Sequence, residues 1–280
     1  MPPFKRAVSR SPNCAADDWG MSPGVNEGIL RLCEAGIVRK VSLFANLDHV
    51  RCGLDRLLRF DHLRFSVHLN LTHGAPLSRP EEVPSLCRPD SLFQSLPTLL
   101  QNTVRGRLRA EEIELEGRRQ IRRLKSLGVP LTGIEGHHHV HLIPKVFSSL
   151  SAALGEEGIR CIRIPIDKSH FPSRLAGLLF KHWLLSAKAP PRAHEFELLP
   201  TLCLRQRDLR TLESLKKKIL ASDGLPVIVH PALRNDLPQM KYFDPYQAER
   251  VLQFDKLLEL SLGGGESALP YADIDRDRHE

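Results

Sequence analysis

Short apolar runs alternate along the chain with longer stretches of helical periodicity. The apolar runs have the length and composition of strands, and they cover Val38–Asn46, Arg64–Leu71, Arg160–Pro165 and Pro226–His230. A further run, Thr132–His141, is predicted as a strand that continues into a loop. Alternation of strands and helices is typical of a parallel sheet with helices outside it, either closed as a barrel or open and doubly wound. The pattern therefore predicts an α/β fold.

The stretches between these runs carry start and stop signals for helices. Ser22 can cap a helix that begins at Pro23, and Gly36 can end it. The predicted helices span Pro23–Ala35, Ala110–Leu127, Pro144–Glu157, Leu209–Leu220 and Pro245–Leu260. Residues 72–109, rich in Pro, Ser and Arg, interrupt the rhythm, and we expect them to form a long loop over the mouth of a barrel. A plain surface insertion is the alternative.

The composition is that of a globular protein, because 41% of the 280 residues are hydrophobic and 26% are charged. No apolar run approaches the length of a membrane span and no signal peptide is recognised, so we expect no membrane partner. The net charge is +7, but the basic stretch Arg105–Lys125 also holds glutamates and no aromatic residue, which indicates a solvated helix rather than a nucleic-acid site. Six cysteines without C-x-x-C spacing predict reduced thiols and a cytoplasmic location.

Histidines are concentrated in the segment Gly136-His137-His138-His139-Val140-His141. If this segment is extended, His137, His139 and His141 share one face and His138 points the other way. Several imidazoles on one face suit a metal site or a proton-transfer site. A hydrogen-bonded core histidine and a surface tract with casual metal affinity are the alternatives, but four histidines in five positions favour a functional site.

Other polar residues lie where predicted strands end. Asp17 and Asp18 precede the capped helix, His68 shares a strand face with Asn70, and His230 follows an apolar run. The carboxyl ends of parallel strands ring one mouth of a barrel, where active sites gather. One carboxylate with two imidazoles is a recurrent ligand set for a hydrolytic divalent metal, so these positions predict a metal site.

Four motifs in this order resemble those of the YdjC-like (ChbG-like) carbohydrate deacetylases. They are Ala16–Ile29 with its Asp17-Asp18-Trp19-Gly20 start, Val67–Leu77, Gly136–His141 with Pro144, and His230-Pro231-Ala232. The resemblance implies a single (β/α) barrel of TIM-like type over residues 1–262, followed by a tail, residues 263–280, whose last residues we expect to be disordered. It also implies an apolar strand before the aspartates, whereas Arg6–Asn13 contains Pro12, so we expect a degenerate first strand.

The resemblance further implies a hydrolase that acts on the carbon–nitrogen bond of linear amides. Its substrates would be N-acetylated sugars such as chitooligosaccharides, and its cofactor a divalent metal, Mg²⁺ by family habit. Matched by position, the metal ligands are Asp18, His68 and His137, and the general base is Asp17. The candidates for the acid that protonates the sugar amine are His139, His141 and His230. Imidazole ligands suit Zn²⁺ or another transition metal better than Mg²⁺, so the identity of the metal stays open.

Two other functions remain as alternatives at this point. A degenerate first strand would favour a catalytically inactive sugar-binding or scaffold member of the same fold. Another metal-dependent hydrolase, such as a phosphoesterase, is the second alternative, although two-metal sites often need more carboxylates than Asp17 and Asp18. The family includes homodimers, but the sequence identifies no interface.

Overall fold

Seven parallel strands close into a barrel in the computed structural model, which describes residues 12–166, 171–186, 189–190, 193–234 and 247–262. Each strand pairs with its neighbours in chain order, and β1 closes the barrel by pairing with both β2 and β7. The strands are β1 (Cys14–Trp19), β2 (Val38–Leu43), β3 (Arg64–Leu69), β4 (Leu131–Gly136), β5 (Cys161–Pro165), β6 (Glu197–Cys203) and β7 (Val227–Val229). This architecture confirms the predicted α/β barrel.

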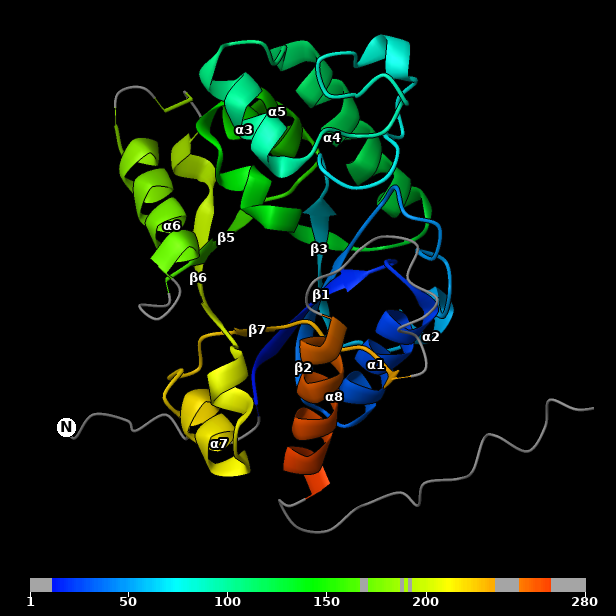
Figure 1. Cartoon of the computed structure of the whole chain (residues 1–280), viewed down its shortest axis with the longest axis vertical. Helices are drawn as coiled ribbons and strands as arrows, with labels where there is room; N and C mark the ends of the chain where they lie inside the picture. The colour runs from blue at the N-terminus through cyan, green and yellow to red at the C-terminus, as the bar shows by residue number, and fades with distance from the viewer. Residues whose placement is uncertain (1–11, 167–170, 187–188, 191–192, 235–246, 263–280) are drawn as a thin grey trace, which may run out of the picture.

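Helices surround the barrel in the order expected for alternating strands and helices (Figure 1). They are α1 (Pro23–Glu34), α2 (Leu54–Leu57), α3 (Leu96–Val104), α4 (Ala110–Ser126), α5 (Pro144–Glu156), α6 (Phe171–Leu184), α7 (Leu212–Leu220) and α8 (Gln247–Leu262). Short 3₁₀ turns are η1 (Pro80–Glu82), η2 (His137–Leu142), η3 (Ala193–Glu195) and η4 (Gln206–Leu209). No helix among the described residues is long and apolar enough to cross a membrane.

The first strand is complete, so the expectation of a degenerate strand is wrong. β1 comprises the six residues Cys14–Trp19, all of them buried, and it includes both aspartates. The strand begins after Pro12 and Asn13, and the Asn13 carbonyl already accepts a hydrogen bond from the Val227 N–H. Small apolar residues, Cys14 to Ala16, therefore precede the aspartates in the barrel. Residues 6–11 and the tail 263–280 lie outside the described residues.

The histidine segment is not extended as expected. β4 ends at Gly136, and η2 follows with His138 and His139 in the left-handed region, at φ 53° and φ 56°. Gly136 permits this turn because a Cβ there would lie 2.9 Å from His141 Nδ1. The prediction that alternate histidines share one face is therefore wrong, and the side chains are distributed by a turn rather than by a strand.

β6 was absent from the predicted strands, because Pro200 interrupts its apolar run. Pro200 pairs in register with Ile164, and the flanking residues complete the ladder to β5. A proline lacks the N–H that a sheet normally uses, so its presence argued against a strand.

Residues 72–109 form a compact excursion fixed to α4, consisting of η1, α3 and an antiparallel bridge between Cys87 and Phe93. The buried carboxylate of Glu116 accepts hydrogen bonds from the N–H groups of Leu77 (3.1 Å) and Ser78 (2.9 Å). Glu112 accepts one from the Ser85 N–H at 2.6 Å. Two acidic side chains of α4 thus hold the excursion by its backbone, on the side of the molecule toward which β3 runs (Figure 1).

Candidate active site

Asp18, His68 and His137 converge although they come from three different strand ends. One ligand atom from each lies within 4.8 Å of the others. Asp18 Oδ1 is 3.1 Å from His68 Nε2 and 3.4 Å from His137 Nδ1. Phe44, fully buried, packs edge-on against both imidazoles, with ring centroids 4.8 and 5.2 Å away. The three ligand atoms therefore meet beside an apolar wall.

The hydrogen bonds around Ser42 determine the tautomer of His68. The Ser42 hydroxyl donates to Asp17 Oδ1 at 2.9 Å, and Ser42 Oγ also lies 3.0 Å from His68 Nδ1. Because the hydroxyl hydrogen is already directed at Asp17, His68 Nδ1–H must be the donor in the second contact. In the neutral imidazole Nε2 then carries the lone pair, and this nitrogen lies 3.1 Å from Asp18 Oδ1.

This arrangement fits a metal ion. Asp18 Oδ1 and His68 Nε2 are both acceptors, both buried, and neither has a hydrogen-bond partner of acceptable geometry. Two acceptors 3.1 Å apart repel one another unless a cation lies between them. Although burial favours the neutral acid, the Arg250 guanidinium holds the pKa of Asp18 well below its usual range. Burial lowers the pKa of His137 to about 4, which leaves it a neutral imidazole able to ligate.

Asp17 has a different set of partners, although it is adjacent to Asp18. Arg163 on β5 forms a bidentate pair with it, at 2.7 Å to Oδ1 and 2.5 Å to Oδ2. Burial favours the neutral acid, but the Arg163 guanidinium outweighs it and holds the pKa of Asp17 below its usual range. Arg163 also contacts Glu135, so its charge is shared between two buried carboxylates. Asp17 is thus an ionised and rigidly oriented carboxylate.

Helix α8 closes the other side of the aspartate pair. Arg250, only 3% exposed, donates from Nη2 to Asp18 Oδ2 at 2.6 Å. Gln253, one turn later, accepts from the His230 N–H at 2.6 Å. Arg250 occupies one oxygen of Asp18 and leaves the other facing the imidazoles, so α8 orients the carboxylate.

The three remaining candidate histidines lie in different surroundings. His230 Nε2 is 3.7 Å from Asp17 Oδ2, and its side chain is 38% exposed, so it has access to a substrate. His141 is buried, bonds the Arg163 carbonyl through Nε2 at 2.8 Å, and has its pKa lowered to about 3 by burial. His139 is half-buried, and burial lowers its pKa well below the usual range. Of the three, His230 alone combines a partly exposed side chain with a position beside Asp17.

Four residues of the site were not singled out from the sequence: Ser42, Glu135, Arg163 and Arg250. Arg163 left a signal, because it stands between Ile162 and Ile164 in a predicted interior strand. A charged side chain is placed there only when it is paired. No sequence signal marks Arg250, because an arginine in an amphipathic helix is ordinary.

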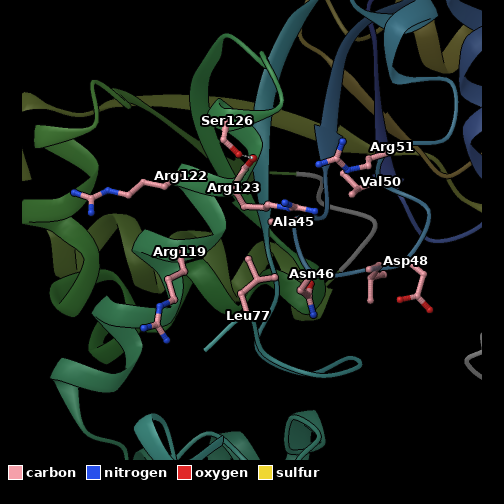
Figure 2. Close-up of a pocket in the computed structure, with 11 residues that line it drawn as sticks. Ala45, Asn46, Asp48, Val50, Arg51, Leu77, Arg119, Arg122, Arg123 and Ser126 are labelled. Atoms are coloured by element: carbon pink, nitrogen blue, oxygen red, sulfur yellow. Dashed lines mark hydrogen bonds between the residues drawn. The ribbon is translucent and has the colours of Figure 1, made fainter. Parts of the chain in front are cut away.

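A separate hollow of about 660 Å³ lies between the loop after β2 and helix α4. Figure 2 shows Arg123 of α4 reaching toward the loop that carries Arg51. Arg119 and Arg122, which also line it, pair with Glu82 and Glu157. None of the site residues predicted from the sequence lines this hollow.

Comparisons with known proteins identify relatives of this chain. A family model described as YdjC-like protein matches residues 14–261. A chitooligosaccharide deacetylase of Escherichia fergusonii is 34% identical over 249 residues, which cover 88% of this chain and 90% of the relative. A carbohydrate deacetylase of Thermoanaerobacter pseudethanolicus is 30% identical over 154 residues, 55% of this chain and 60% of the relative.

A carbohydrate deacetylase of Brevibacillus brevis is 34% identical over 151 residues, 54% of this chain and 56% of the relative. The chain thus matches 60% or less of the length of these last two relatives. A crystal structure from Enterococcus faecalis, described as a candidate cellobiose-phosphate cleavage protein, has a TM-score of 0.65 at 20% identity, covering 91% of this chain and 94% of that one. This likeness concerns the fold. Because the family model spans the barrel from its first strand to its last helix, the chain belongs to the YdjC-like protein family.

Proposed function

We propose that this chain is a metal-dependent hydrolase that removes acetyl groups from N-acetylated sugars, with chitooligosaccharides or related glycans as substrates. One observation carries the proposal: two adjacent buried aspartates have separate surroundings, one facing two imidazoles and the other paired with an arginine. A hydrolytic site needs both a cation-binding carboxylate and a proton-accepting one. The names of the deacetylase relatives support the choice of substrate.

Asp18, His68 and His137 would hold the metal ion. A divalent cation there would supply the positive charge that polarises the acetamide carbonyl and favours deprotonation of a water molecule. The family habit favours Mg²⁺, whereas a set of one carboxylate and two imidazoles suits Zn²⁺ or another transition metal. Arg250 keeps Asp18 ionised and turned toward the imidazoles.

Asp17 would act as the general base. Its two oxygens are fixed by Arg163 and Ser42, so the carboxylate is oriented before substrate arrives. Since its pKa lies below the usual range, Asp17 remains ionised, and therefore able to accept a proton, at neutral and mildly acidic pH. The attacking water would lose its proton to this carboxylate as it adds to the acetamide carbon.

His230 would act as the general acid. As the carbon–nitrogen bond breaks, the sugar nitrogen must gain a proton to leave as an amine, and acetate is the other product. His230 lies near Asp17, is partly exposed and has its backbone N–H held by Gln253. Residues 72–109 would wall the substrate cleft, with Arg105 and Arg107 as donors to sugar hydroxyl groups.

The complete strand β1 removes the reason for expecting an inactive scaffold, since both aspartates are buried and positioned. The test is release of acetate from N,N′-diacetylchitobiose by the purified chain, before and after EDTA, with Mg²⁺, Mn²⁺ or Zn²⁺ restored separately. We expect release that EDTA abolishes and one of the metals restores. Absence of acetate release with every metal would favour the inactive scaffold. Hydrolysis of a phosphate ester in place of the acetyl group would favour the phosphoesterase.

A further inference from the structure

A second group of three histidines adjoins the Asp18 cluster on its outer side. It consists of His73, from the loop after β3, with His137 and His138 of η2, and one ligand atom of each lies within 4.8 Å of the others. The ring centroids of His73 and His137 are 4.7 Å apart, those of His137 and His138 are 4.0 Å apart, and those of His73 and His138 are 5.6 Å apart. His137 belongs to both groups. We call His73, His137 and His138 the outer trio.

The backbone of His73 is held by two amide side chains, one buried (Asn70) and one half-buried (Asn46). Its N–H donates to Asn70 Oδ1 at 3.0 Å, and its carbonyl accepts from Asn70 Nδ2 at 2.8 Å and from Asn46 Nδ2 at 3.2 Å. Asn70 is itself fixed, because Gln120 bonds both its N–H and its carbonyl. The position of His73 is therefore set by a network that reaches back to α4, and not by a loose loop.

His138 is directed into the trio by a strained backbone. Its φ of 53° is in the left-handed region, which is unfavourable for a non-glycine residue. Thr72 Oγ1 lies 3.1 Å from His138 Nδ1 and fixes the ring. Ligating histidines commonly have one ring nitrogen bound by a neighbouring group, which orients the other toward the metal. With Nδ1 at Thr72, Nε2 is the nitrogen that His138 would offer to an ion.

We propose that the outer trio is a second, transition-metal site that competes with the Asp18 cluster for His137. Three imidazole nitrogens without a carboxylate select Zn²⁺, Co²⁺, Ni²⁺ or Cu²⁺ and discriminate against Mg²⁺. A neutral imidazole has a single lone pair, so His137 serves one ion at a time. The outer trio is also the more accessible of the two groups to solvent. His138 is exposed and His73 is half-buried, while Asp18 and His68 are buried. A transition metal can therefore reach the outer trio from the surface and withdraw His137 from the inner cluster.

The binding test uses zinc in a chain whose inner cluster is disabled. His68→Gln removes an inner imidazole without altering the outer trio, and Zn²⁺ is titrated into this variant by calorimetry. We expect one Zn²⁺ per chain, bound about tenfold or more weakly when His73→Ala or His138→Ala is added. His62→Ala, an exposed histidine remote from the site, is the matched control and should change nothing. Equal affinity with and without His73 would overturn the proposal.

A measurement on the unaltered chain guards against a misfolded variant. Imidazole nitrogen resonances are recorded during a Zn²⁺ titration in the presence of saturating Mg²⁺. The signals of His73 and His138 should shift together with that of His137. If only His68 and His137 respond, the outer trio binds no metal and the proposal fails.

The inhibitory consequence rests on the proposed deacetylase function. If Mg²⁺ is the metal that restores acetate release, excess Zn²⁺ should suppress that release in the unaltered chain and in His62→Ala, and should do so about tenfold less potently in His73→Ala. Inhibition of equal potency in His73→Ala would contradict competition for His137. A chain that releases no acetate but still loses Zn²⁺ affinity with His73→Ala would refute the deacetylase function and leave the second metal site standing.

Discussion

The two neighbouring aspartates of β1 differ in how completely their polar atoms are satisfied. The Asp17 carboxylate accepts hydrogen bonds from Arg163 and Ser42 on both of its oxygens, and His230 lies nearby. Asp18 has one oxygen bonded to Arg250, while its other oxygen faces two imidazoles without a hydrogen bond. A carboxylate whose two oxygens are both hydrogen-bonded is held in a fixed orientation. A carboxylate with one oxygen that lacks a hydrogen bond and faces imidazole nitrogens is suited to bind a cation. Backbone geometry makes this possible, because Asp18 has φ 72° and breaks the register between β1 and β2.

The largest effect should come from removing a proposed metal ligand. His137→Ala should reduce kcat/KM for acetate release by about 10³-fold or more, since the proposed cation would stabilise the transition state by several kcal/mol. His182→Ala, a histidine of α6, is the control. Activity within tenfold of the unaltered chain would show that the Asp18 side of the pair does not bind the catalytic cation.

Removing the partner of Asp17 should destabilise the fold. Arg163→Met leaves buried carboxylates uncompensated and should lower the free energy of unfolding by about 3–5 kcal/mol at pH 7, measured by urea denaturation. Arg160→Met, which removes an exposed ion pair with Glu195, should cost about 1 kcal/mol or less.

The effect of Arg163→Met should also depend on pH. Arg163 holds the pKa of Asp17 below its value of about 3.9 in the unfolded chain, so the pair stabilises the fold fully above that value. The contribution of the pair is lost as the pH falls from about 4 through the lower folded-state pKa, where Asp17 protonates. The difference between Arg163→Met and the unaltered chain should therefore shrink on acidification, and a difference that grows at low pH would contradict the pairing.

A smaller effect is expected at the proton donor. His230→Gln should lower kcat about 10²-fold and leave metal affinity unchanged, because His230 contacts Asp17 and not the Asp18 cluster. Partial burial lowers the pKa of His230. An acid must be protonated to act, so kcat of the unaltered chain should fall as the pH rises through that lowered pKa. His230→Gln should lose this alkaline limb, and an unchanged pH profile would transfer the role to another histidine.

The smallest effect concerns the excursion formed by residues 72–109, for which we proposed a contact with substrate. Arg105→Ala with Arg107→Ala should raise KM for a long chitooligosaccharide about fivefold, as expected for loss of about 1 kcal/mol of hydrogen bonding, with kcat and metal affinity unchanged. Arg59→Ala, an exposed residue after α2, serves as the surface control. If the double variant and the unaltered chain had the same KM, residues 72–109 would be a surface insertion that does not contact the substrate.

Local patterns in the sequence predicted much of this molecule. Strand–helix alternation and the caps at Ser22 and Gly36 led to the barrel, and strand-end reasoning with the family motifs brought Asp18, His68 and His137 to one place. These features depend on a few neighbouring residues. β6 was not predicted, because Pro200 contradicts the local pattern of a strand and its pairing with β5 joins residues far apart in the sequence.

The rest of the site depends on contacts between distant residues. Arg163 reaches Asp17 across 146 positions and Arg250 reaches Asp18 across 232, and no local periodicity records either pairing. The left-handed turn at His138 and His139 is similarly unfavourable on its own and is imposed by the surrounding structure. An extended conformation for residues 137–141 is the ordinary continuation of a strand, and this is why the turn was not predicted.

The most direct test of the division between the aspartates compares two isosteric variants, Asp17→Asn and Asp18→Asn, by titration with Mn²⁺ followed by electron paramagnetic resonance. Mn²⁺ prefers oxygen ligands and so reports the Asp18 cluster rather than the outer trio. Circular dichroism first establishes that both variants are folded. We expect Asp17→Asn to bind Mn²⁺ like the unaltered chain while acetate release falls about 10²–10⁴-fold, and Asp18→Asn to lose both. Equal loss of Mn²⁺ in the two variants would contradict the account, because the aspartates would then share one role.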